Sequence, residues 1–169
     1  LAMVIYRTTR PHAARLGKVP NSPFYRNVER FEDVEDRPEL LIVRFDARLY
    51  FANLSYFRRK LEDWADQKSD ALKAIIINAE SISSVDSSAV HMLQDVVEEY
   101  KEQGVEIYFT SVIGPVRDAM AKSHLIDEIG EDHFFMSIGD AVEYLDKKWG
   151  EQTIDEETEY SDYTLQTNV

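Results

Sequence analysis

The sequence contains no cysteine among its 169 residues. This absence excludes disulfides, thiol nucleophiles and cysteine-ligated zinc clusters, and it fits a reducing compartment, for which the cytoplasm is the default. Glycine is also scarce, and the 6 glycines form neither a phosphate-binding loop nor a dinucleotide fingerprint. The histidines are scattered and form no closely spaced pair, so we predict no metal site and no cofactor; they are His12, His91, His124 and His133.

Basic residues are outnumbered by acidic ones. The chain has 19 Lys and Arg against 32 Asp and Glu, and its net charge of -13 argues against a nucleic-acid partner, because phosphate contacts need clustered cations. The charges are unevenly placed. Residues 1–30 hold six Lys or Arg and a single acid, whereas residues 151–169 hold six acids and no Lys or Arg. We therefore predict an acidic, disordered tail over residues 150–169.

No hydrophobic run is long enough to cross a bilayer, which takes about 20 apolar residues. The apolar stretch at residues 1–6 is short and is followed by Arg7 and Arg10. It fits the last turn of a membrane helix with cations at its cytoplasmic exit, and it fits an ordinary soluble element equally well. Prolines at 11, 20 and 23 indicate an extended linker after it.

The remaining chain alternates between strand and helix patterns, and 44% hydrophobic residues suit one domain with a sizeable core. We predict strands over 25–31, 40–45, 72–78, 105–110 and 133–136, and helices over 53–67, 87–104, 114–121 and 140–149. The first two strands are expected to form a hairpin. This order predicts the α/β class: a mixed sheet of four or five strands, with four or five helices packed mainly on one face.

The most informative stretch is Asp86-Ser87-Ser88, where the strand at 72–78 gives way to an amphipathic helix. A hydroxyl in the first helical turn can carry a phosphate, since the free amides and the helix dipole stabilise its charge. Simple helix capping accounts for the same residues, because Asp and Ser are preferred at that position. We predict that Asp86 accepts from the amide of Ser88 or Ala89, and that Ser87 is exposed.

Catalysis is not expected. Ser87, His91 and Asp95 follow one another at i, i+4 and i+8 of one helix. This spacing makes a stripe and not a convergent triad. We therefore predict that the protein is not an enzyme.

Several motifs together resemble a known family. They are Leu16-Gly17-Lys18-Val19-Pro20 with Tyr25-Arg26-Asn27, Leu49-Tyr50-Phe51-Ala52-Asn53 with Tyr56-Phe57, Val85-Asp86-Ser87-Ser88, and Ile129-Gly130 through Phe134-Phe135 to Asp140-Ala141-Val142. Over about residues 7–148 the chain is similar to the STAS domain at the cytoplasmic C-terminus of SulP-type anion transporters. The stretch at 49–53 is the most specific of these motifs. The Asp-Ser-Ser loop also resembles that of bacterial anti-sigma-factor antagonists.

The resemblance implies a division into the end of the last transmembrane helix and a basic linker (1–23), a STAS domain (24–149) and the tail (150–169). The implied role is a regulatory and partner-docking domain of an inorganic anion permease, of the sulfate or bicarbonate class, at the cytoplasmic face of the membrane. Implied partners are the transmembrane domain of the same permease, a second copy in a homodimer and a cytoplasmic protein, with no nucleic acid. The anion site is expected in the membrane domain.

The resemblance to the antagonists assigns phosphorylation to Ser87, the serine that follows the aspartate. One departure is Ala89, where antagonists usually have glycine, and its methyl group is expected to obstruct a kinase. The alternative function is a stand-alone anti-sigma-factor antagonist that works as a serine phospho-switch. The gene sequence upstream of Leu1 would distinguish the two, because only a permease has membrane spans there.

Overall fold

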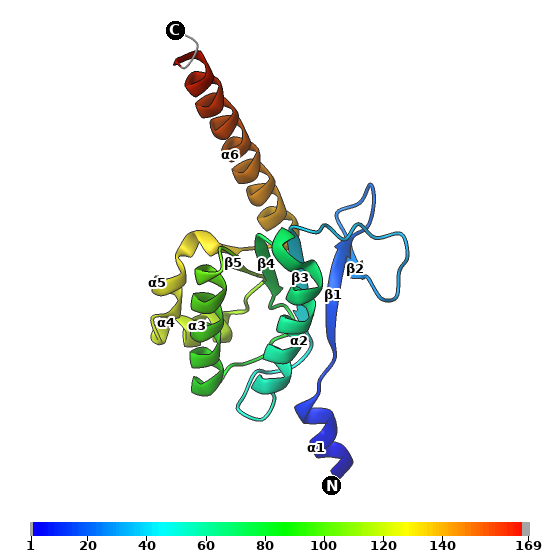
Figure 1. Cartoon of the computed structure of the whole chain (residues 1–169). Coiled ribbons are helices and arrows are strands. Elements are labelled where there is room, and N and C mark those ends of the chain that lie inside the picture. The colour runs from blue at the N-terminus through cyan, green and yellow to red at the C-terminus, as the bar shows by residue number, and fades with distance from the viewer. Residues whose placement is uncertain (1, 167–169) are drawn as a thin grey trace.

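The computed structural model describes residues 2–166 of the chain (Figure 1). In chain order the elements are α1 (Ala2–Thr9), β1 (Ala13–Lys18), β2 (Tyr25–Asn27), β3 (Leu40–Phe45), α2 (Leu54–Lys68), η1 (Ser69–Ala71), β4 (Ala74–Asn78), α3 (Ser87–Glu102), β5 (Glu106–Thr110), α4 (Gly114–Lys122), α5 (Leu125–Ile129), η2 (Glu131–His133), β6 (Phe134–Phe135) and α6 (Ile138–Gln166).

The strands form one mixed sheet in the order β2-β1-β3-β4-β5-β6. The four strands from β3 to β6 run parallel, and β1 is antiparallel to both of its neighbours. The predicted mixed α/β sheet is confirmed, with six strands where four or five were expected. The predicted hairpin is wrong, because β1 lies between β2 and β3.

Strand β1 lies within the segment that was predicted to be an extended linker. Its sequence, Ala-Ala-Arg-Leu-Gly-Lys, is poor in the β-branched and aromatic residues that mark strands. Gly17 has a structural reason here, because a Cβ atom on it would lie 2.8 Å from the backbone oxygen of Glu35. The segment around Glu35 crosses close to β1 and forms a bridge with Lys18. Gly17, which falls in the predicted linker, thus lies where two backbone segments approach closely.

Helices cover both faces of the sheet, but unequally. The larger core packs α2, α3, α4 and α5 against one face, where Ile75 and Ile77 point. The alternate residue Ile76 points to the other face, where α6 supplies Ala141 and Leu145. The expectation that the helices lie mainly on one face is confirmed.

The two ends of the described chain are helical. Helix α1 falls on the residues predicted to end a membrane helix, and α6 continues to Gln166, well past the expected end at Trp149. Helix α6 includes residues 150–166 of the predicted acidic tail, and 167–169 lie outside the described residues. Within residues 2–166, none of the helices combines the length and the apolar character that a membrane crossing demands.

Candidate functional site

The aspartate of the Asp-Ser-Ser loop caps helix α3 as predicted. Asp86 has an extended backbone, and its Oδ1 accepts a hydrogen bond of 2.8 Å from the amide of Ala89. The amide at the third helical position would otherwise be an unpaired donor. The cap fixes where α3 begins and therefore where Ser87 and Ser88 stand.

The same carboxylate also holds a second loop. Its Oδ2 accepts a hydrogen bond of 3.0 Å from the amide of Phe51, which is 35 positions earlier in the chain. The backbones of the two loops are paired as well, because the amide of Leu49 donates to Ser84 and the amide of Asp86 donates to Leu49. The motifs at 49–53 and 85–88, which the sequence presents as separate, form one bracket.

Asn53 supports this bracket from inside. It is buried, and its side chain accepts from the amide of Tyr50 at 3.1 Å and donates to the carbonyl of Arg48 at 2.8 Å. Asn53 stands at the N-cap position of α2, but its side chain closes the turn that leads into the helix and makes no capping bond to it.

Both serines are exposed. Neither Ser87 nor Ser88 makes a side-chain hydrogen bond within the described part of the chain, so both hydroxyls face solvent at the positive end of α3. Ala89 is completely buried. Its methyl group packs into the core, so the expectation that it obstructs access to Ser87 is wrong.

The bracket lies at one edge of the sheet together with α1. The loops that contain Phe51 and Ser87 follow β3 and β4, so both lie at the carboxyl ends of these parallel strands. Residue Ala13, just after α1, pairs with Phe45 at the same end of β3. A 2.7 Å contact between His12 and Asp46 ties these segments together. Figure 1 shows α1 and the loop before α2 at the same end of the molecule.

The histidines do not converge on a metal centre. No group of three or more His, Cys, Asp or Glu side chains suited to a metal ion occurs in the described residues. His91 contacts the side chain of Gln94 at 3.2 Å. The sequence-based view of Ser87, His91 and Asp95 as a stripe on one helix agrees with their places on α3.

Sequence reasoning found Asp86, Ser87 and Ser88 but missed the contribution of Phe51, whose side chain is 74% exposed beside them. A signal existed. The motifs at 49–53 and 85–88 each follow a buried strand, and loops at the carboxyl ends of neighbouring parallel strands lie close together. Neither motif alone contains that information.

Comparison with known proteins gives a family match. A family model described as "STAS domain" matches residues 32–141. Sulfate transporter 1.1 of Arabidopsis thaliana is 28% identical over 159 residues, which are 89% of this chain and 24% of the transporter. The probable sulfate transporter 4.2 of the same plant is 32% identical, over 85% of this chain and 22% of the transporter. The chain thus spans about a quarter of the curated relatives it matches.

Solved structures show the same fold. The murine Solute Carrier 26 family member A9 anion transporter, in its inward-facing state, aligns with a TM-score of 0.76 at 24% identity, over 85% of this chain and 23% of that one. A putative anti-sigma factor antagonist from Thermotoga maritima aligns with a TM-score of 0.56 at 17% identity, over 65% of this chain and 90% of that one. Because the family model covers well over half of the sequence, the chain belongs to the STAS domain family.

Proposed function

We propose that this chain is the cytoplasmic regulatory domain of a SulP-type inorganic anion permease, and that it has no catalytic role. The observation that carries the proposal is the extent of the transporter likeness. The alignment with the plant sulfate transporter 1.1 covers 89% of the chain, whereas the family model matches only residues 32–141. The antagonist aligns with only 65% of the chain. The likeness to transporters therefore includes segments outside the common domain.

Helix α1 supports this reading. Its Met3, Ile5 and Tyr6 are more than half exposed, and Arg10 lies 5.2 Å from the ring of Tyr6. Apolar side chains followed by an aromatic residue and a cation are typical of the cytoplasmic end of a membrane helix. If α1 ends such a helix, the bracket faces the membrane domain, since it lies at the same sheet edge.

In this proposal Ser87 is the regulatory position. Its hydroxyl is exposed, it follows the cap residue, and the amides of the first turn favour a phosphate. A charge introduced there changes the field at the edge that faces the membrane domain. The regulated contact is then the one between this domain and the transmembrane part of the same permease, with a cytoplasmic protein as a further partner.

Strand β2 supports a homodimer of the full permease. It is an edge strand of three residues, and Phe24 and Phe31 beside it are 62% and 48% exposed. A free edge with aromatic flanks can pair with a neighbouring copy. Light scattering of the full-length permease in mild detergent is expected to give a dimer, and a monomer would remove this part of the proposal.

The main test uses the full gene. Its sequence upstream of Leu1 is expected to encode hydrophobic spans, and the full-length protein is reconstituted in vesicles. Uptake of labelled sulfate and of labelled bicarbonate is measured for the intact protein and for a variant that ends before Ala13. Reduced or deregulated uptake at equal protein content supports the proposal. A start codon at Leu1, or unchanged uptake in the truncated variant, contradicts it.

A further inference from the structure

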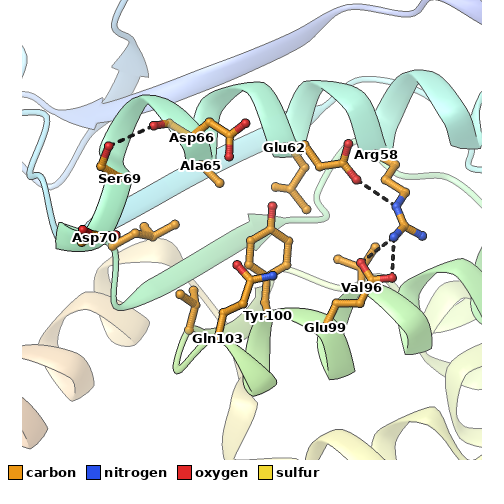
Figure 2. A pocket seen from close by; sticks show the side chains of 13 residues that line it. Arg58, Glu62, Ala65, Asp66, Ser69, Asp70, Val96, Glu99, Tyr100 and Gln103 are labelled. Carbon is orange, nitrogen blue, oxygen red and sulfur yellow. Dashed lines mark hydrogen bonds and ion pairs between the residues drawn. The ribbon is translucent and has the colours of Figure 1, made fainter.

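A groove of about 570 Å³ lies between α2 and α3. Figure 2 shows the two helices on either side of it, with side chains from both pointing into the gap. Its floor is apolar and buried, and it is formed by Leu61, Ala65, Leu72, Val96 and Val105. Such a floor accepts the aliphatic stem of a long side chain while the rim remains in contact with water.

The rim of the groove is acidic. Four carboxylates line it, from Glu62, Asp66, Asp70 and Glu99, against one cation, Arg58. Arg58 is already engaged, because it contacts Glu62 on its own helix at 3.0 Å and Glu99 on α3 at 2.5 Å. The side chains of Asp66 and Asp70 form no ion pair with any of the described residues. The rim therefore has an excess of negative charge that the rest of the described chain does not neutralise.

Tyr100 adds an observation that is independent of the charge count. The residue is only 8% exposed, yet its hydroxyl projects into the groove between the helices, toward the carboxylate rim (Figure 2). This hydroxyl makes no hydrogen bond to any residue that the structure describes. Burial, and then the charges of Glu62 and Asp66, raise the pKa of Tyr100 to about 12. A nearly buried phenol thus stays protonated, with unused hydrogen-bonding capacity, in a negative field.

We propose that this groove is a docking site for a basic peptide segment of a partner protein, with an arginine or lysine side chain inserted between α2 and α3. The stem of the inserted side chain packs on the apolar floor, and its N–H groups donate to the oxygen of Tyr100 and to Asp66. A second cation of the segment contacts Asp70. Charge complementarity selects this occupant, because an acidic or neutral segment would leave the carboxylates of the rim without a cation.

The groove is separate from the Ser87 bracket. Ser69 to Leu72 and Gln103 to Val105 come just before β4 and β5, so the groove reaches the amino ends of these parallel strands. Ser87 follows β4 at the carboxyl end. The inference goes beyond the proposed transporter role and does not depend on it, since it rests on the helical face alone.

The test uses the 169-residue chain and a fluorescent pentapeptide probe, acetyl-Leu-Arg-Leu-Leu-Arg-amide, with Kd measured by polarisation. Tyr100→Phe keeps the ring and removes only the hydroxyl, and it is expected to raise Kd about tenfold, as the loss of a hydrogen bond to a charged group does. Asp66→Asn is expected to raise Kd about threefold. It keeps the test valid if the melting temperature shows that Tyr100→Phe alters the fold.

The control is Asp63→Asn, which removes the same charge from an exposed position of α2 that does not line the groove. It is expected to leave Kd unchanged. Equal weakening by Asp63→Asn and Asp66→Asn would overturn the proposal in favour of attraction to the acidic surface in general. Equal affinity for a probe with citrulline in place of arginine, or no binding at millimolar probe, would also overturn it. If spermine displaces the probe, and its own affinity falls in the same variants, the groove is a site for small organic cations instead.

Discussion

Asp86 is the residue on which the bracket depends, because one carboxylate accepts from two amides on different elements. Asp86→Ala removes both the α3 cap and the bond to Phe51. We expect a loss of about 1 to 2 kcal/mol in the free energy of unfolding, in the upper part of the range for a lost cap. Urea unfolding measures it. Asp95→Ala, at an exposed position in the middle of the same helix, serves as the control, and equal stability of both variants would contradict the double role.

At the scale of single residues, the sequence predicted contacts between near neighbours in the chain. The cap at Asp86 follows from residue preferences within three positions, and its acceptance from Ala89 is confirmed. The bond from Phe51 could not be predicted, because it depends on β3 and β4 lying side by side. The burial of Ala89 also depends on the tertiary packing of α3. For the same reason nothing local identified Tyr100 as the centre of a groove.

Among the elements, long apolar patterns were predictable and short mixed ones were not. Residues 40–45, 87–102 and 106–110 lie in the predicted strand or helix because hydrophobic periodicity dominates there. Strand β1 has weak intrinsic preference and is held by pairing with β2 and β3 on either side. Tertiary pairing overrides local propensity in such a strand.

Gly17 provides a test of this account of β1. Gly17→Ala would improve local propensity, but the added Cβ lies 2.8 Å from the carbonyl oxygen of Glu35, so the crossing segment must shift. We expect a loss of about 1 to 3 kcal/mol, as for an overpacked site. Gly150→Ala is the matched control, because a Cβ there meets open space on helix α6, and it is expected to stabilise by about 0.5 to 1 kcal/mol. Stabilisation by both substitutions would contradict the close approach.

Helix α6 is anchored to the sheet by an ion pair with a defined pH dependence. Lys148 donates to Glu106 at 2.6 Å, and Tyr108 donates to the same oxygen at 2.9 Å. Burial alone would raise the pKa of Glu106, but the hydrogen bonds from Lys148 and Tyr108 outweigh burial and leave that pKa below its usual value. A carboxylate with a depressed pKa adds stability above its unfolded pKa, and this stability is lost as the pH falls through the folded pKa.

We therefore expect Lys148→Gln to destabilise the protein at pH 7, by about 0.5 to 1 kcal/mol for so exposed a pair. The difference from the unchanged protein is full above the ordinary pKa of a glutamate carboxyl, and it shrinks as the pH falls through the lowered pKa of Glu106 in the folded protein. Thermal unfolding across this range measures it. Lys147→Gln, on the exposed neighbour, is expected to have no such pH-dependent effect. A difference that persists after Glu106 is protonated would mean that Lys148 acts through packing.

At the scale of the whole molecule, the bracket and the acidic groove lie toward opposite ends of the parallel strands. The carboxyl ends of the parallel strands hold the bracket and α1, and the acidic groove reaches toward the other end. In the proposed function, a charge at Ser87 acts at the end that holds α1 and leaves the groove between α2 and α3 unaltered. Because the Ser87 hydroxyl makes no hydrogen bond within the described residues, we expect its replacement to leave the fold intact.

The last prediction concerns Ser87 in the full-length permease, and it rests on the proposed function. A phosphate adds about −1.5 to −2 charges; the α3 amides favour it, and the adjacent Asp86 carboxylate opposes it. The two effects nearly cancel, so stability should change by less than about 1 kcal/mol, the scale of one dipole interaction. Ser87→Glu is a partial mimic, with one charge and fewer acceptor oxygens. We expect anion uptake by the Ser87→Glu and Ser87→Ala permeases to differ, while the melting temperatures of the 169-residue chains agree.

Ser83→Glu is the matched control, because it adds the same charge at an exposed serine that lies before the cap residue and outside helix α3. It should leave uptake unchanged if the position at the helix terminus matters. Equal uptake by the unchanged, Ser87→Ala and Ser87→Glu permeases would mean that Ser87 serves only to begin helix α3. A large loss of melting temperature in Ser87→Ala would instead assign Ser87 a structural role. Anion uptake therefore reports on regulation and melting temperature on folding, so the two measurements distinguish these two roles of Ser87.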